Sequence, residues 1–485
     1  MELDSERCYQ ALKAHDARFD GVFFTGVRTT GIYCRPVCPA RLPKFESCLF
    51  FRHAATAERA GFRPCLRCRP ELAPGRSPVE AASRLAAAAA ARIEAGALND
   101  GSLEDLACSL EVSSRQLRRV VESELGVTPI ELAQTQRLLL AKRLLTESTL
   151  SMADVAFASG FSSVRRFNAL FRERYGLNPF AIRKTAGANT GGESIRLKLV
   201  YRPPLAWEAM LAFLAARATV GVEVVADGRY GRTLAVGERR GWITAEPFPG
   251  ASALRVEIAA SLLPVLPRVL AKLRGFFDLD ADPAAIAAHL GADPRLGPLV
   301  EREPGLRVPG AFDGFDLGLR AILGQQVSVR GATTLAARFA EAFGEPIDTP
   351  IAGLTRLPAS PERIARACID EIMALGVTTA RARSIRALAV AVTRCGLKIE
   401  PGPSPETRIA QLQEVPGIGP WTAHYIGMRA LRWPDAFPHD DLGIKKALCE
   451  PNPARVLEQA EAWRPWRAYA AMHLWDEFRG PSSEF

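Results

Sequence analysis

Residues 412–423, with the sequence LQEVPGIGPWTA, decide the fold of the C-terminal half. The PGIGP segment consists of turn-forming residues, and the apolar stretches around it recur at helical spacing. Gly417 and Gly419 let the backbone turn tightly, so we expect two helices joined by a hairpin. The backbone N–H groups beside these glycines can bind a phosphate. From Phe276 to the end, we expect a mostly helical structure.

A second segment, Pro438-His439-Asp440-Asp441, follows the hairpin. Together the two segments resemble the helix–hairpin–helix superfamily of DNA glycosylases, which implies that Gly417 and Gly419 lie at a DNA contact. Longer stretches resemble AlkA-type alkyladenine glycosylases along residues 195–478. They read YRPPLAWEAMLAFLAARATVGVE (201–223), LAVGERRG (234–241), RAILGQQVSV (320–329) and WRPWRAYAAMHLW (463–475). The resemblance implies an enzyme that excises alkylated bases of the 3-methyladenine class from double-stranded DNA.

By this resemblance, Asp441 is the catalytic carboxylate. Such a carboxylate stabilises the oxocarbenium-like sugar as the base leaves and helps to position or activate water. Asp440 is the neighbour most easily confused with it. The alternative role for Asp440 is to cap the following helix through its side-chain oxygen.

Four aromatic residues match positions that line the base pocket of AlkA-type enzymes. They are Phe213, Trp421, Tyr425 and Trp475. Aromatic residues at helical spacing more often belong to a core, but an alkylated purine carries positive charge, which aromatic faces attract. The same charge makes the base a good leaving group.

Three positions bear on how closely the chain follows the AlkA pattern. Leu442 stands where a relative has Tyr, so the sequence does not predict how broad the base pocket is. Gln326 stands where an AlkA-type relative inserts an apolar side chain into the duplex. Gln can still fill the gap left by a flipped base. Trp421 stands where lyase-type members carry a Schiff-base Lys, so we expect a monofunctional enzyme. Only Cys449 follows Asp441, too few ligands for an iron–sulfur cluster.

Upstream of this half, residues 195–275 are β-branched, partly alternating and broken by glycines. They predict an antiparallel sheet with one or two helices. The stretch TAGANTGGES (185–194) is small and polar, which is typical of a flexible linker.

Residues 102–123 and 150–174 each predict a helix, a tight turn and a second helix. VAFASGFSSVRRFNALFRERYGLNPFAIRK (155–184) resembles the AraC family signature, which implies that segments 114–123 and 162–172 enter the major groove of DNA. The arginines expected to reach DNA are Arg115, Arg118, Arg119, Arg165 and Arg166. The alternative is an ordinary helical bundle with surface arginines.

The N-terminal region contains a CxxxC pair, Cys34 and Cys38, and a CxxC pair, Cys65 and Cys68. Two close thiol pairs on separate turns can hold zinc tetrahedrally. From spacing alone, a purely structural zinc is the more common case. A metal would also supply the staple that a small domain of this kind needs.

FFTGVRTTGIYCRPVCPAR (23–41) and AGFRPCLRC (60–68) resemble the zinc domain of the Ada family over residues 4–75. The resemblance makes Cys34 the acceptor of a methyl group from a DNA methyl phosphotriester, with the other three thiols as zinc co-ligands. The transfer changes the site charge from −2 to −1, a plausible switch of DNA affinity. The arginines available for phosphate contacts are Arg28, Arg35, Arg63, Arg67 and Arg69.

The net charge of +9 and pI near 9.2 favour a polyanionic partner. Residues 1–190 hold 27 Lys and Arg against 20 Asp and Glu, so +7 of this charge lies there. No stretch has the length and apolarity of a membrane span, and the N-terminus has no export signal. We therefore expect a cytoplasmic protein without a membrane partner. We also expect it to be a monomer.

The predicted fold class is multidomain and mostly α with α+β parts. The expected domains are a zinc domain (1–77), an AraC-type double helix-turn-helix domain (78–186), a linker (187–194), an antiparallel-sheet α+β domain (195–303) and a helix–hairpin–helix glycosylase domain (304–485). The expected function is DNA-alkylation repair and its regulation, with alkylated and promoter DNA and RNA polymerase as partners. One alternative is a DNA-binding regulator whose glycosylase half is inactive, and another is a glycosylase whose zinc domain is structural.

Overall fold

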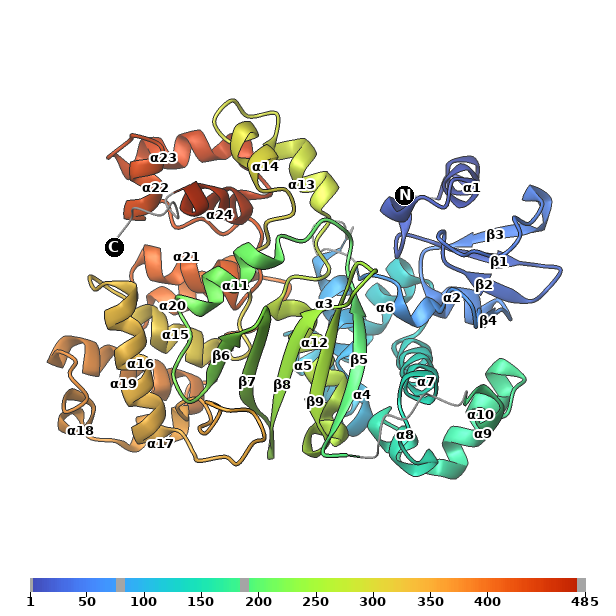
Figure 1. The fold of residues 1–485 in the computed structure, drawn as a ribbon, viewed down its shortest axis with the longest axis horizontal. Helices are drawn as coiled ribbons and strands as arrows, with labels where there is room; N and C mark the ends of the chain where they lie inside the picture. Colours follow the sequence, from blue (N-terminus) through green and yellow to red (C-terminus); the bar gives the residue numbers. More distant parts are fainter. Residues whose placement is uncertain (1–2, 76–82, 184–191, 478–485) are drawn as a thin grey trace. The chain divides into compact units, whose positions relative to one another are not determined.

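The computed structural model describes residues 3–75, 83–183 and 192–477 (Figure 1). Its chain forms two compact units. The first unit comprises Met1–Arg202, Phe248–Ala271 and Leu279–Ala281, and the second comprises Pro203–Pro247, Lys272–Asp278 and Asp282–Phe485. Within the described ranges, no helix is long and apolar enough to cross a membrane. Most of the expected linker, residues 187–191, lies outside the described residues, and Ser194 is already the first residue of a strand.

The first unit begins with a four-stranded sheet in the order β3-β1-β2-β4. Its strands are β1 (Phe24–Val27), β2 (Ile32–Cys34), β3 (Cys48–Phe51) and β4 (Arg63–Pro64). Strand β1 is antiparallel to β2 and β3, whereas β2 and β4 are parallel. Two helices accompany the sheet, α1 (Ser5–Lys13) and α2 (Ala54–Arg59), together with the short 3-10 turns η1 (Ala17–Phe19), η2 (Phe45–Ser47) and η3 (Pro70–Leu72).

A helical segment follows the sheet. Its helices are α3 (Arg84–Glu94), α4 (Ala97–Asp100), α5 (Leu103–Ser109), α6 (Ser114–Leu125), α7 (Pro129–Glu147), α8 (Met152–Ala158), α9 (Val164–Tyr175) and α10 (Pro179–Ile182). The pairs α5/α6 and α8/α9 confirm the two predicted helix-turn-helix motifs. Gly160 has φ +87 in the second turn, a conformation that glycine adopts without strain. The Phe161 and Phe167 rings lie 5.3 Å apart across this turn.

A second sheet has five strands in the order β5-β9-β8-β7-β6, which confirms the antiparallel sheet expected between residues 195 and 275. In the first unit, β5 (Ser194–Val200) pairs with β9 (Ala253–Ala259). In the second unit, β6 (Glu223–Ala226), β7 (Arg229–Val236) and β8 (Arg239–Pro247) form an antiparallel meander. The segment also contains α11 (Trp207–Ala215), η5 (Ala260–Val265) and the beginning of α12 (Leu266–Phe276).

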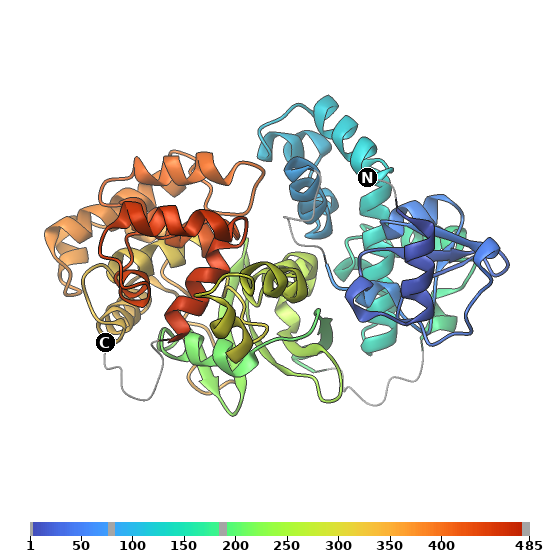
Figure 2. The same cartoon turned by 90° about the horizontal axis from the view of Figure 1, so that it is seen from above.

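The rest of the second unit is helical, as predicted for the chain from Phe276 onwards. Its helices are α13 (Pro283–Leu290), α14 (Gly297–Arg302), α15 (Gly314–Leu323), α16 (Val329–Phe343), α17 (Pro361–Arg366), α18 (Ile369–Met373), α19 (Thr379–Thr393), α20 (Pro405–Gln413), α21 (Pro420–Arg429), α22 (Leu442–Ala447), α23 (Pro453–Gln459), η6 (Ala460–Trp463) and α24 (Arg467–Glu477). Helices α15, α19 and α21 share one apolar core, to which Ile322, Leu388 and Ile426 contribute. Figure 2 shows these yellow to red helices from above. Because this core fixes α21 and the hairpin before it, it positions the residues around Asp441.

Candidate functional sites

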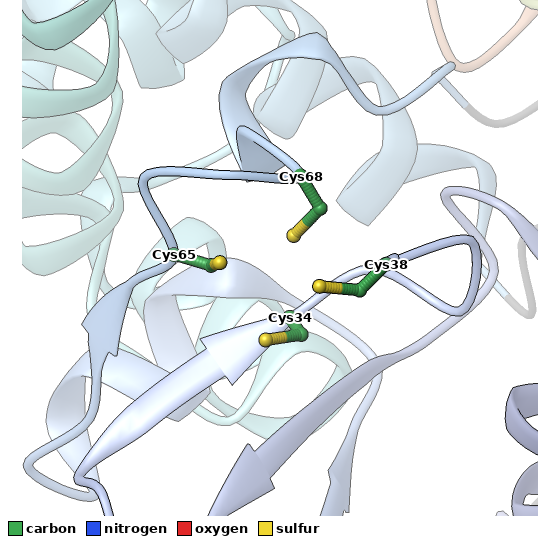
Figure 3. A group of neighbouring side chains, drawn as sticks. All are labelled: Cys34, Cys38, Cys65 and Cys68. Atoms are coloured by element: carbon green, nitrogen blue, oxygen red, sulfur yellow. The ribbon is translucent and has the colours of Figure 1, made fainter. Parts of the chain in front are cut away.

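The four predicted cysteines converge at one edge of the first sheet (Figure 3). Cys34 ends β2 and Cys65 follows β4, the strand paired with β2, while Cys38 and Cys68 lie in the turns that follow. The four Sγ atoms all lie within 4.8 Å of one another and point toward a common centre. Cys34 is partly exposed and the other three are buried.

Backbone N–H groups orient two of these sulfur atoms. The amide of Arg35 donates to Cys68 Sγ at 3.3 Å, and the amide of Arg67 donates to Cys65 Sγ at 3.3 Å. Such donors stabilise thiolate over thiol, and four thiolates suit zinc better than any hard cation. The side chains therefore fit a zinc ion, and the one partly exposed sulfur, Cys34, is the one a substrate can reach.

The structure corrects two of the expected phosphate contacts near this site. Arg35 is buried, forms an ion pair with Asp20 and donates to the carbonyl oxygen of Cys68 at 3.1 Å. Arg69 is occupied by Glu71 and Glu147. Arg35 therefore braces the zinc domain, and Arg69 ties it to α7, so neither guanidinium is directed at DNA. Arg28 and Arg67 are exposed, and Arg63 is half-buried.

The second helices of the two helix-turn-helix motifs, α6 and α9, are amphipathic. Their buried faces carry Leu117 and Val121 in α6 and Phe167 and Phe171 in α9. The arginines expected to reach DNA all lie exposed on the opposite faces: Arg115, Arg118, Arg119, Arg165 and Arg166. This arrangement leaves the guanidinium groups available to a phosphate or a base edge.

In the second unit, Asp441 lies immediately before α22 and receives three N–H donors. Trp421 Nε1 donates to Oδ2 at 2.8 Å, Trp475 Nε1 donates to Oδ1 at 2.9 Å, and the amide of Ile444 donates to Oδ1 at 3.0 Å. Charge-assisted bonds of this kind suit an ionised carboxylate and fix its direction. Asp441 is thus placed by α21, α22 and α24 together.

The alternative role considered for Asp440 is wrong. The helix cap is Asp441 itself, whereas Asp440 forms an ion pair with Lys445 and its side chain is 54% exposed. Leu442, the first residue of α22, is also exposed.

We use the name aromatic cluster for the four predicted aromatic residues, Trp421, Tyr425, Trp475 and Phe213. The rings of Trp421 and Tyr425 stack with centroids 5.4 Å apart, and Trp475 lies 6.2 Å from Tyr425. Phe213 joins through Arg429, whose guanidinium lies over the Phe213 ring and donates to Tyr425 Oη at 2.7 Å. The structure thus brings Trp421 and Trp475 against Asp441 and connects Tyr425 and Phe213 to them.

Two arginines in the cluster were missed by sequence reasoning. The guanidinium groups of Arg429 and Arg217 both lie over the Phe213 ring, at 4.9 and 3.9 Å from its centroid. Burial by itself raises the pKa of Tyr425, but the charges of Arg429, Arg217 and Arg320 and the hydrogen bond from Arg429 together lower it. Each arginine follows an aromatic residue of the cluster by four positions, Phe213 and Tyr425, and this helical spacing was the signal in the sequence that could have indicated them.

Gly443 was also missed. A Cβ atom at this position would lie 3.1 Å from Asp441 Oδ1 and 3.3 Å from Trp475 Cδ1. A larger residue would therefore push the carboxylate or the indole away.

The hairpin before α21 needs only one of its two glycines for its conformation. Gly417 has φ +84, and a Cβ there would lie 1.9 Å from Ser384 Oγ. Gly419 has the ordinary extended values φ −84 and ψ 178, with nothing within 4 Å of its Cβ position. The expectation that both glycines permit the turn is corrected for Gly419. Within the described residues, neither glycine's amide N–H donates a hydrogen bond, so both remain available to a phosphate.

Gln326 is exposed and has φ 55, a left-handed conformation that is uncommon for a residue other than glycine. Its neighbour Gln325 holds the loop, since its amide group donates to the carbonyl oxygen of Gly417 and to Thr422 Oγ1, both at 3.0 Å. The loop of Gln326 is thereby tied to the hairpin.

Four family models match successive parts of the chain. They are the metal binding domain of Ada (residues 7–71), a helix-turn-helix domain (106–185), the AlkA N-terminal domain (196–313) and the HhH-GPD superfamily of base excision DNA repair proteins (319–463).

A probable bifunctional transcriptional activator/DNA repair enzyme AlkA from Mycobacterium tuberculosis is 39% identical over 100% of this chain and 99% of that protein. The chain belongs to this family of bifunctional AlkA proteins. DNA-3-methyladenine glycosylase 2 of Escherichia coli is 42% identical over 57% of the chain and 95% of its own length. The solved structure of a 3-methyladenine DNA glycosylase from Archaeoglobus fulgidus, with TM-score 0.52 and 23% identity, covers 59% of the chain and 99% of its own and shares the fold.

Membership confirms the two resemblances inferred from sequence, the multidomain fold class and zinc as the metal. A bifunctional AlkA protein carries two DNA-binding parts, a helix-turn-helix regulator and a base-excision enzyme.

Proposed function

We propose that the chain repairs alkylated DNA and regulates that repair. Its C-terminal half is a monofunctional glycosylase for alkylated bases of the 3-methyladenine class. Its N-terminal half accepts a methyl group from DNA methyl phosphotriesters on Cys34 and then acts as a transcription activator. The observation that carries the glycosylase assignment is the carboxylate of Asp441, which is held by the indole N–H groups of two aromatic-cluster residues.

In the glycosylase half, the damaged base leaves the duplex and stacks against the aromatic cluster. The bond from the sugar C1′ to the base nitrogen breaks, and the base takes the electron pair. A cationic base becomes neutral in this step, so it needs no proton. Asp441 stabilises the positive charge that develops on the sugar, and water then adds to C1′ and releases a proton. Trp421 offers no amine for a Schiff base, so the reaction stops at the abasic site.

On the DNA side, Gln326 would fill the gap left by the flipped base. The amides of Gly417 and Gly419 would bind a backbone phosphate.

In the N-terminal half, the sulfur of Cys34 attacks the methyl carbon of the phosphotriester. The methyl–oxygen bond breaks, the phosphodiester leaves with the electron pair, and Cys34 becomes a thioether. Bound zinc keeps the four cysteines deprotonated and so keeps Cys34 nucleophilic near neutral pH. The loss of one negative charge reduces repulsion of DNA phosphates, which favours operator binding through the arginines of α6 and α9.

The test of the glycosylase half is release of free 3-methyladenine from methylated duplex DNA. The wild type should release the base, and Asp441→Asn should not. Asp440→Asn is the matched control, because Asp440 is exposed and bonded to Lys445, and it should retain activity. If none of the three proteins releases base while all bind DNA, the inactive-glycosylase alternative is correct.

Further parts of the proposal concern partners and organisation. We infer a cytoplasmic monomer that contacts RNA polymerase when it activates transcription. We place the domains at residues 1–77, 78–186, 195–303 and 304–485, with a linker at 187–194. The family matches support the division near residue 190, since one match ends at 185 and the next begins at 196, whereas the AlkA N-terminal match continues past 303 to residue 313.

A further inference from the structure

Arg217, two residues beyond α11, places its guanidinium in the aromatic cluster. The guanidinium carbon lies 3.9 Å from the centroid of the Phe213 ring, and Nη1 donates to the carbonyl oxygen of Phe213 at 3.4 Å. Within the part of the chain that the structure describes, Arg217 has no ion pair. Its main contact is thus with the face of an aromatic ring.

The charges around Arg217 are mixed. Burial lowers the pKa of Arg217, Tyr425 and Asp441 favour its charged form, and Arg429 disfavours it. Arg320, which donates to the backbone carbonyl of Arg217 at 3.4 Å, adds further positive charge nearby. The guanidinium is therefore a cation held in a partly buried position by the Phe213 ring, by a long hydrogen bond to the carbonyl oxygen of Phe213 and by a side-chain hydrogen bond with Tyr425.

Arg429 differs from Arg217 in how it is held. It is buried and donates to the carbonyl oxygens of Pro309 at 2.7 Å and Gly310 at 3.2 Å as well as to Tyr425. These bonds fix Arg429 in the framework. Arg217 has fewer such partners among the described residues, namely the carbonyl oxygen of Phe213 and a side-chain hydrogen bond with Tyr425, so it is the arginine that is held less firmly.

A flipped base and the Arg217 guanidinium compete for the same ring face. At 3.9 Å the guanidinium is in van der Waals contact with Phe213, which leaves no room for a base between them. A cationic base would in addition be repelled by the guanidinium at such short range. One of the two has to leave before the other can stack on that face.

We propose that Arg217 is a specificity-determining residue that occupies the base position over Phe213 in the free enzyme and that the incoming base must displace. The inference rests on the proposed glycosylase function. When Arg217 leaves, its cation–π contact with the Phe213 ring is lost. A cationic alkylated base makes a new cation–π contact with that ring, whereas a neutral purine only stacks on it. Arg217 therefore disfavours neutral bases by the strength of one cation–π contact, which corresponds to roughly 3- to 30-fold.

The test compares duplexes that carry a single 7-methylguanine, which is cationic, or a single hypoxanthine, which is neutral. Single-turnover excision is measured for the wild type, Arg217→Met and Arg217→Lys. Arg217→Met removes the charge at similar length, and Arg217→Lys keeps a cation. We expect Arg217→Met to lower the preference for 7-methylguanine by roughly 3- to 30-fold, mainly through faster hypoxanthine excision, and Arg217→Lys to stay near the wild type.

Three results would overturn the inference. They are unchanged rates for both bases, an equal fall in both rates, which would make Arg217 a structural residue, and a selective loss of hypoxanthine excision, which would make it a hydrogen-bond donor to the base. Equilibrium binding of the same duplexes in an Asp441→Asn background measures the preference without chemistry. If the wild type excises neither base, the proposed function fails, and the binding preference still decides the role of Arg217.

Discussion

Asp441 and Gly443 depend on each other within one turn of chain. The first residue carries the carboxylate and caps α22, and the second leaves the space in which that carboxylate and Trp475 meet. We expect Gly443→Ala to reduce excision of 3-methyladenine roughly tenfold or more, because small displacements of a reacting group are costly. Gly402→Ala is the matched control, since nothing lies within 4 Å of its Cβ position. Equal activity of the two variants in single-turnover assays would show that the space at Gly443 is not required.

At the scale of single residues, sequence patterns identified groups whose neighbours are close along the chain. The four cysteines lie in two short pairs, whose spacing predicted a metal site, and Asp441 was predicted through the resemblance to AlkA-type glycosylases. Arg217 and Gly443 were not, because their importance arises from Tyr425 and Trp475, which lie in distant segments of the chain. The choice between Asp440 and Asp441 as the helix cap could not be made from two adjacent acids alone.

The hairpin illustrates the same limit for an element. A PGIGP segment between helices predicts a turn, but only the packing of Gly417 on Ser384 shows which glycine is required. We expect Gly417→Ala to destabilise the protein by more than about 1 kcal/mol and to weaken DNA binding, because alanine is strained at φ +84. Gly419→Ala keeps the backbone amide at an ordinary φ and should be tolerated. Thermal unfolding and DNA titration of both variants test this difference. Equal effects of Gly417→Ala and Gly419→Ala would contradict the prediction.

Glu58 joins three elements of the first unit. Its buried carboxylate accepts hydrogen bonds from Tyr33 in β2 at 3.2 Å, Thr135 in α7 at 2.9 Å and Tyr175 in α9 at 3.2 Å. The zinc sheet and the second helix-turn-helix motif thus share one polar junction. No sequence pattern indicates this junction, because its members are far apart along the chain.

The junction should make stability depend on pH. Burial raises the pKa of Glu58 from 4.5 to about 7, so its contribution is fully present below about pH 4.5 and is lost as the pH rises through 7. Glu58→Gln removes this titration, and the variant should lose less stability than the wild type between pH 5 and pH 8, by up to about 3 kcal/mol. Thermal unfolding at the two pH values measures the difference. Glu124→Gln, on the exposed face of α6, is the control, and parallel curves for Glu58→Gln and wild type would refute the assignment.

For the whole molecule, the sequence predicted the order of the domains better than the strands and helices within each of them. The linker composition and the switch from helical to β-branched patterns located the change near residue 190. The four-stranded zinc sheet was not predicted, because strands of two to four residues are too short to show alternation. Most of the net positive charge lies in the first 190 residues, as expected for the half that carries the exposed arginines of α6 and α9.

The two chemical centres belong to different compact units, and this separation predicts two independent activities. Cys34→Ala should lose methyl uptake from methylated DNA completely, because no other thiol of the zinc site is exposed, yet it should release 3-methyladenine at the wild-type rate. Asp441→Asn should show the opposite pattern. Radiolabelled methyl transfer and base release, measured on the same preparations, give all four values, and zinc content and circular dichroism verify that Cys34→Ala is folded. If Cys34→Ala still accepts methyl groups, the acceptor assignment is wrong. If it folds but loses base release, the two activities are coupled, and the glycosylase depends on the state of the zinc centre.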